Sequence, residues 1–222
     1  LYAETSIGSD TTRLVKLDAA TGKELEVIAQ DPKSDIGAVM IQPDTRVVQA
    51  VSFNYLKTEW KVIDPAVRAE FEALPKLAPG EFSVTSRDRA DKTWIVAYQR
   101  DDGPVAWYTF DRAKRTGELL FVNQPDLAKY TLAKMEAVTI KARDGMELVA
   151  YLTLPPGAEP KNLPLVLNVH GGPWARDTWG YDPEAQWFAN RGYATLQVNF
   201  RGSSGLGKKY LNAGNGQWGV GA

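Results

Sequence analysis

The residues best suited to chemistry form a turn, His170-Gly171-Gly172-Pro173, directly after the apolar run LVLNV at 165–169. Glycine permits positive φ and leaves the backbone amides uncovered by a Cβ, so a ligand's carbonyl oxygen can approach them. Such amides form oxyanion holes, which stabilise the negative charge that develops during acyl transfer. We therefore interpret Gly171 and Gly172 as candidate oxyanion-hole residues. The alternative is that the two glycines only permit a tight strand-to-helix turn.

His170 is the only histidine among the 222 residues. A histidine that acts as a general base needs a nucleophile within hydrogen-bond reach and an acid that orients the ring, and the sequence offers no candidate for either. We expect instead that hydrogen bonds hold the imidazole in the turn, where it shapes the glycine loop. With no second histidine and no cysteine, we expect neither a metal site nor a cofactor.

A second glycine-containing segment, NFRGSSGLGKKYL at 199–211, imitates the phosphate-binding loop G-x-x-x-x-G-K-[ST]. Lys209 stands where that loop needs a serine or threonine to hold magnesium, and an ammonium group cannot replace the hydroxyl. Ser203 and Ser204 lie outside any G-x-S-x-G elbow, the turn that presents the nucleophile in α/β-hydrolases. We interpret both serines as loop hydroxyls.

The elements around the first turn predict a parallel sheet. We expect the run at 165–169 to be a strand buried on both faces, and the segment at 193–200 to be a second buried strand. A helix between them is predicted over 182–192, with Asp182 as the cap, Pro183 in the first turn and Gly192 at the end. Ligands of open α/β sheets bind at the carboxyl ends of the strands, where the glycine turn lies.

Before these elements the sequence MEAVTIKARDGMELVAYLTLPPG at 135–157 predicts a long hairpin that turns at Asp144-Gly145. A polar, proline-containing connector then leads to residue 165. Strand, helix and strand in this order indicate an α/β fold for the later part of the chain.

The first 130 residues have a different pattern, because hairpins repeat with a period near that of a β-propeller blade. Asp18, Asp64 and Asp111 lie 46 and 47 residues apart, and each follows an alternating strand with a partner strand upstream. A blade takes about 40 to 50 residues, and a closed propeller needs about 4 to 8 blades. Three repeats therefore predict part of a propeller. An ordinary antiparallel sandwich is the alternative.

The second repeat carries an interruption, DPAVRAEFEALPKLAPG at 64–80. Its residues predict a short helix inserted on a blade, with Asp64 as the cap, Pro65 in the first turn and Pro75 as the residue that stops it.

Composition excludes several classes of partner. Twenty-six basic and 27 acidic residues give a net charge of -1 with no long run of one sign, so we expect no nucleic-acid or membrane partner. No segment has the roughly 20 apolar residues of a membrane-spanning helix. The absence of cysteine suits either a cytoplasmic or a bacterial periplasmic protein, and the sequence leaves this choice and the possibility of a homo-oligomer open.

The stretch from Leu163 to Gly219, which contains HGGP and NFRGSSG, closely resembles the prolyl oligopeptidase family of serine peptidases, in particular its bacterial dipeptidyl-peptidase and acylaminoacyl-peptidase-like branch. The resemblance implies that residues 1–130 are the C-terminal blades of a β-propeller. It also implies that residues 131–222 are the N-terminal part of an α/β-hydrolase catalytic domain. The expected fold is thus mixed β and α/β, and the expected substrate is an oligopeptide cleaved through a Ser-Asp-His triad.

Carried over to this sequence, the resemblance implies that an amide of Gly171 or Gly172 supplies one oxyanion donor, while the second donor follows the nucleophile. His170 and Arg201 become supporting loop residues, the latter within an N-x-R-G-S segment that also contains Asn199 and Ser203. Three aromatic residues of the stretch are expected in the core: Trp179, Tyr181 and Trp187.

The triad is expected after Ala222, so we expect the chain to be an inactive piece of a longer enzyme. Its partners would be an oligopeptide substrate and the remainder of its own hydrolase domain and propeller. Two alternatives remain at this stage. One is a non-catalytic propeller-based binding module with a vestigial hydrolase segment, and the other is a nucleotide-binding α/β protein.

Overall fold

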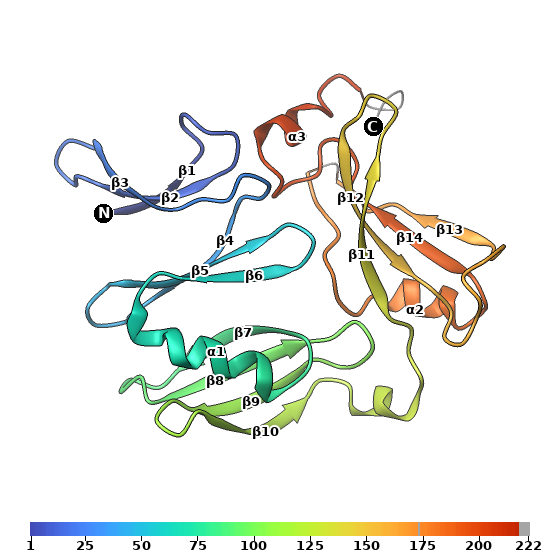
Figure 1. The fold of residues 1–222 in the computed structure, drawn as a ribbon, viewed down its shortest axis with the longest axis horizontal. Coiled ribbons are helices and arrows are strands. Elements are labelled where there is room, and N and C mark those ends of the chain that lie inside the picture. Colours follow the sequence, from blue (N-terminus) through green and yellow to red (C-terminus); the bar gives the residue numbers. More distant parts are fainter. Residues whose placement is uncertain (173, 218–222) are drawn as a thin grey trace.

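The computed structural model describes residues 1–172 and 174–217, in which four β-sheets carry most of the regular structure (Figure 1). Pro173 of the glycine turn and the end of the chain from 218 to 222 lie outside the described residues. Three antiparallel sheets follow one another along one side of the molecule, and the fourth sheet lies beside them (Figure 1).

The first two sheets each have three strands in sequential order. In the first sheet the strands are β1 (Tyr2–Thr5), β2 (Arg13–Leu17) and β3 (Glu24–Ala29). In the second sheet they are β4 (Ile36–Ile41), β5 (Val48–Asn54) and β6 (Thr58–Val62). The third sheet has four strands in the order β10-β9-β8-β7, namely β7 (Glu81–Arg87), β8 (Thr93–Gln99), β9 (Ala106–Asp111) and β10 (Thr116–Val122).

The repeated hairpins predicted from the sequence are confirmed, since β1 pairs with β2, β5 with β6, and β8 with β9, all antiparallel. The three sheets do not close into a ring within the described residues. The structure thus confirms mixed β and α/β elements, while the interpretation of these sheets as propeller blades stays a prediction.

The repeated aspartates share one local role, because each carboxylate accepts amides of the turn that follows its strand. Asp18 Oδ1 accepts from the amides of Ala20 and Thr21 at 3.0 and 2.8 Å, and Asp111 Oδ1 accepts from the Lys114 amide at 3.0 Å. These bonds favour the ionised carboxylates. The pKa values of both groups are lowered, chiefly by the backbone amides of Thr21 and Lys114 respectively.

Asp64 accepts from the Ala66 amide at 3.0 Å and caps a short 3-10 turn, Pro65–Val67, which leads into helix α1 (Arg68–Leu77). The prediction that Pro75 ends this helix is wrong, because α1 continues for two residues beyond it. Phe71 and Leu74 are buried in the core shared by the second and third sheets. A proline this near the carboxyl end removes one hydrogen bond of the final turn, and burial of the apolar face offsets that loss.

The fourth sheet contains the only parallel strand pair within the described residues. Its order is β11-β12-β14-β13, formed by β11 (Met135–Lys141), β12 (Glu147–Thr153), β13 (Leu165–Asn168) and β14 (Ala194–Val198). β13 runs parallel to β14, and helix α2 (Pro183–Ala189) connects them. The hairpin turning at Asp144-Gly145 and the strand-helix-strand unit are therefore confirmed.

The expectation that both faces of the run at 165–169 are buried is wrong. Leu165 and Leu167 are each 57% exposed, and Val169 is 53% exposed. β13 is an edge strand, and on its other face Asn168 Nδ2 donates to Glu184 of α2 at 3.1 Å. Because side chains alternate along a strand, the odd-numbered apolar residues point to the face that α2 does not cover.

The connection between β10 and β11 contains a short 3-10 helix, Pro125–Lys129, and includes the predicted domain boundary at residue 130. A last short helix, α3 (Lys208–Asn212), follows β14. None of the helices in the described part of the chain has the length and apolar character required to cross a bilayer.

Candidate functional site

The glycine turn lies at the carboxyl end of β13, and the His170 ring is fixed within it. Nδ1 lies 2.7 Å from the carbonyl oxygen of Gly171, and Nε2 lies 3.0 Å from Oγ of Ser203. The ring also stacks on Phe200, with 4.5 Å between the centroids. The structure thus brings three of the residues singled out from the sequence together: His170, Gly171 and Ser203.

The two glycines, alike in sequence, have different reasons to be glycine. Gly172 has φ +139°, and a Cβ there would stand 2.8 Å from the amide nitrogen of Trp174, so the turn itself requires glycine. Gly171 has no positive φ, and a Cβ there would meet no atom of the described residues beyond its chain neighbours within 4 Å. Nothing in the local backbone therefore demands glycine at Gly171.

Both glycines are exposed. Within residues 1–172 and 174–217, neither the Gly171 amide nor the Gly172 amide donates a hydrogen bond. Two exposed donors at the carboxyl end of a strand can bind a carbonyl oxygen or an anion from outside the described chain.

Asn199 anchors the segment after the turn. It is fully buried, its Oδ1 accepts from the Asp177 amide at 2.7 Å, and its Nδ2 donates to the Asp177 carbonyl at 3.1 Å. The hydroxyl of Tyr210 donates to the main-chain carbonyl oxygen of Asn199, and the amide of Asn199 donates to the Val149 carbonyl at 2.9 Å. Asn199 thereby ties residue 177 to the end of β14.

The Asp177 side chain lies in this partly buried region, and its Oδ2 atom has no hydrogen-bond partner among the described residues. Burial raises the pKa of the Asp177 carboxyl above its ordinary value, an effect that attraction to His170 partly offsets. The neighbouring Asp182 adds repulsion and raises the pKa further.

Arg201, the other predicted supporting residue, pairs with Asp144 in the turn of the β11–β12 hairpin. The pKa of Asp144 is lowered, first by the hydrogen bond from the Met146 amide and then by Arg201. Arg201 therefore connects the loop after β14 to the hairpin.

In the segment that imitates a phosphate-binding loop, donors that a phosphate would need already donate to acceptors of the protein itself. The amides of Gly207 and Lys209 donate to the carboxylates of Asp35 and Asp10 at 3.4 and 2.8 Å. The Lys208 ammonium donates to the carbonyl of Ser6 at 2.7 Å. A phosphate would have to displace these contacts, which argues against the nucleotide-binding alternative. No feature of the sequence linked residues near 10 and 35 to this loop.

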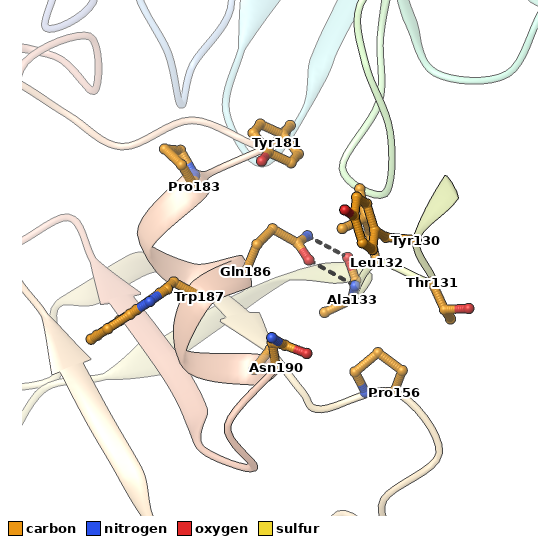
Figure 2. A pocket seen from close by; sticks show the side chains of 11 residues that line it. Tyr130, Thr131, Leu132, Ala133, Pro156, Tyr181, Pro183, Gln186, Trp187 and Asn190 are labelled. Atoms are coloured by element: carbon orange, nitrogen blue, oxygen red, sulfur yellow. Dashed lines mark hydrogen bonds between the residues drawn. The ribbon is translucent and has the colours of Figure 1, made fainter. Parts of the chain in front are cut away.

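A cavity of about 510 Å³ lies between α2 and the segment that leads into β11 (Figure 2). Its lining carries no charged side chain and consists of Tyr130, Thr131, Leu132, Ala133, Pro156, Tyr181, Pro183, Gln186, Trp187, Ala189 and Asn190. Two aromatic residues expected in the core thus line a cavity, and Trp187 is 54% exposed, so the expectation for it is wrong. Trp179 is buried as predicted.

Residues 179–222 match the sequence model described as the prolyl oligopeptidase family. The chain is 48% identical over 225 residues to the dipeptidyl aminopeptidase BIII of Pseudoxanthomonas mexicana, an alignment that covers 98% of the chain and 32% of that protein. It is 36% identical to the dipeptidyl peptidase family member 6 of Caenorhabditis elegans, over 96% of the chain and 32% of that protein. The chain thus spans about a third of the length of these curated relatives.

Two solved structures have a similar fold. The dipeptidyl peptidase 4 of Porphyromonas gingivalis superposes with a TM-score of 0.70 at 17% identity, over 99% of this chain and 31% of that one. A puromycin-hydrolyzing peptidase of Mycobacterium tuberculosis superposes with a TM-score of 0.72 at 20% identity, over 99% of this chain and 35% of that one. On the family match and these relatives, the chain belongs to the prolyl oligopeptidase family.

Proposed function

We propose that this chain forms part of a serine peptidase that hydrolyses peptide bonds of oligopeptides, of the dipeptidyl or acylaminoacyl type. The observation that carries the proposal is the glycine turn at the end of β13, where two exposed amides donate no hydrogen bond within the described residues. The open space around Gly171 leaves room for a substrate carbonyl group.

In this mechanism a serine hydroxyl attacks the carbonyl carbon of the scissile peptide, and the carbonyl oxygen takes up negative charge. An amide of Gly171 or Gly172 donates to that oxygen, and a second donor follows the nucleophile. The Ser-Asp-His triad lies after Ala222 in this proposal. Removal of one such donor costs about 100 to 1,000-fold in kcat, or about 3 to 4 kcal/mol.

The fold supports the same arrangement. The three antiparallel sheets within 1–130 would be propeller blades, and residues 131–222 would begin the hydrolase domain. The exposed side chains of Leu165 and Leu167 in β13, and of Val169 directly after it, then contact the remainder of that domain, because an apolar sheet face is buried against another layer.

The test is made in a full-length enzyme that contains this sequence. A valine at Gly171 would cover the two flanking amides without a backbone clash, because the space around its Cβ is open. We expect Gly171→Val to lower kcat on a dipeptide p-nitroanilide by about 100-fold or more, since the valine side chain keeps the substrate's carbonyl oxygen away from the oxyanion donor. The free energy of unfolding should change by no more than about 0.5 kcal/mol, as is usual for surface substitutions.

Reaction of the unmodified enzyme with a fluorophosphonate probe reports the serine nucleophile separately. Absence of labelling would favour the non-catalytic binding module. Full kcat in Gly171→Val would show that the glycines only form a turn.

A further inference from the structure

We infer that His170 and Ser203 form a positioning pair that fixes the direction of the Gly172 amide. The inference rests on the proposed function, because it concerns the donor that the oxyanion would use. Neither side chain needs to touch the substrate. Their role follows from the hydrogen bonds within the turn.

The imidazole of His170 carries its proton on Nδ1. Nδ1 of His170 lies 2.7 Å from the carbonyl oxygen of Gly171, and a carbonyl oxygen can only accept a hydrogen bond. Nδ1 must therefore carry the proton. The neutral ring then has Nε2 as an acceptor.

The same hydrogen bond orients the peptide group between the two glycines. The Gly171 carbonyl and the Gly172 amide belong to one planar trans unit, so the C=O and N–H bonds point in opposite directions. When Nδ1–H holds the carbonyl oxygen, the Gly172 N–H points away from the imidazole. One hydrogen bond thus sets the direction of the donor.

Such a bond matters at this position because the peptide lies between two residues without a Cβ. Glycine samples a wider range of backbone dihedrals than any other residue, so a Gly-Gly peptide can rotate more readily than its neighbours. Both glycines are also exposed, and Gly171 has open space where its Cβ would stand, whereas Gly172 is close to the backbone of Trp174. On the Gly171 side of this peptide the imidazole supplies the restraint.

Ser203 supports the same tautomer when its hydroxyl turns toward the ring. Its side chain is fully buried, its Oγ lies 3.0 Å from Nε2 of His170, and its hydroxyl donates to the carbonyl of Phe200 at 2.7 Å. A hydroxyl rotates about its C–O bond, so its single proton can be turned to Nε2 instead. The Phe200 carbonyl then still accepts from the Ser203 amide at 3.0 Å.

The ring plane is fixed as well, since His170 stacks on Phe200 with an interplanar angle of 19°. Ser203 and Phe200 both belong to the segment after β14, whereas His170 follows β13. Contacts from the segment after β14 thus hold the His170 ring, and this ring in turn holds the glycine turn after β13.

A spectroscopic test does not depend on activity. His170 is the only histidine of the chain, so ring ¹⁵N signals of the 222-residue protein labelled at histidine belong to it alone. We expect the neutral ring to carry its proton on Nδ1. Ser203→Ala should shift the population toward the Nε2–H form, and the neighbouring Ser204→Ala serves as the matched control without a shift. A neutral ring protonated on Nε2 in the unmodified protein would overturn the inference.

A kinetic test uses a full-length enzyme that contains the sequence. His170→Ala should lower kcat by about 100-fold with little change in KM, because one oxyanion donor loses its orientation. His170→Asn should recover most of this loss, since its amide nitrogen is bonded to Cγ as Nδ1 is and can donate to the Gly171 carbonyl. The kcat of Ser203→Ala should lie between those of His170→Ala and His170→Asn, and the kcat of Ser204→Ala should match that of the unmodified enzyme.

The outcomes separate the two proposals. If the unmodified enzyme reacts with a fluorophosphonate probe and His170→Ala keeps full kcat, the positioning pair is wrong and the peptidase stands. If the probe does not react, the proposed function fails, while the ¹⁵N spectra still decide the tautomer. A His170→Asn variant that folds, judged by its denaturation midpoint, yet is as slow as His170→Ala would also contradict the inference.

Discussion

At Asp177 a hydrogen-bonded main chain is combined with a partly buried carboxylate whose pKa is raised. Its amide and carbonyl are held by Asn199, yet its Oδ2 is buried and finds no hydrogen-bond partner in the part of the chain that the structure describes. Burial disfavours the ionised carboxylate and raises the pKa of this group in the folded protein above its ordinary value of 3.8. The folded state therefore holds this proton at pH values where the unfolded chain has released it.

The sign of the pH effect follows from this difference. The contribution of Asp177 to stability is fully present below the unfolded pKa and declines as pH rises through the folded pKa. We expect Asp177→Asn to have a higher melting temperature than the unmodified protein at pH 7, with a smaller difference near pH 3. Melting curves across this range test it. A lower melting temperature for the variant at pH 7 would show that the carboxylate has a stabilising partner.

Among the single elements, helix α2 holds two other segments of the chain through the side chain of Gln186. Asp182 caps the helix through the Ala185 amide at 2.7 Å, as predicted, and Gln186 reaches outward to the segment before β11. Gln186 Oε1 accepts from the Ala133 amide and its Nε2 donates to the Ala133 carbonyl, both at 2.8 Å (Figure 2). A third bond joins Nε2 to the Asp101 carbonyl at 3.1 Å. One buried side chain thus connects three segments.

Gln186→Leu should destabilise the protein by about 1 to 3 kcal/mol, because the buried amide and carbonyl of Ala133 lose their partner while the volume of the side chain is largely kept. Chemical denaturation measures the change. Asn190→Ala, an exposed position on the same cavity, is the matched control, and we expect it to stay within about 0.5 kcal/mol. Equal effects of the two changes would contradict the role of Gln186.

At the scale of the whole molecule, charged groups hold the first sheets against the fourth. The Arg176 guanidinium donates to the carbonyls of Asn54 and Tyr55 at 2.8 and 2.9 Å. The Lys57 ammonium lies 3.8 Å from the centre of the Trp179 ring, and Asp10 accepts from the Lys209 amide at the start of α3. These contacts place the turn between β5 and β6 beside the segment that follows the glycine turn.

Arg176→Lys should weaken this junction, because an ammonium group cannot reproduce the two-pronged geometry of the guanidinium. Loss of a hydrogen bond from a charged group costs about 1.5 to 3 kcal/mol. We expect a lower denaturation midpoint and faster hydrogen exchange at the β5–β6 turn. Lys209→Ala should leave both unchanged, since Lys209 contributes its backbone amide to the junction and its side chain is exposed. Unchanged exchange in Arg176→Lys would show that the junction does not depend on Arg176.

Features with a local cause could be predicted from the amino-acid sequence. Alternation set the hairpins, aspartates fixed their turns, and Asp182 with Pro183 started α2, because these signals act over a few residues. The prediction that α1 ends at Pro75 is wrong, because burial of Phe71 and Leu74 stabilises the helix beyond it. The exposure of Leu167 was also missed, because the run of apolar residues does not reveal that β13 lies at an edge.

The contacts that hold the candidate site together depend on the packing of distant segments and could not be predicted from the sequence. The tertiary structure separated Gly171, which stands in open space, from Gly172, whose backbone requires glycine. It also placed Ser203 against His170, and Asp10 against Lys209 at the start of α3, across 33 and 199 residues of chain. Hydrogen bonds between residues so far apart depend on how the strands and loops pack, and no pattern of neighbouring residues encodes them.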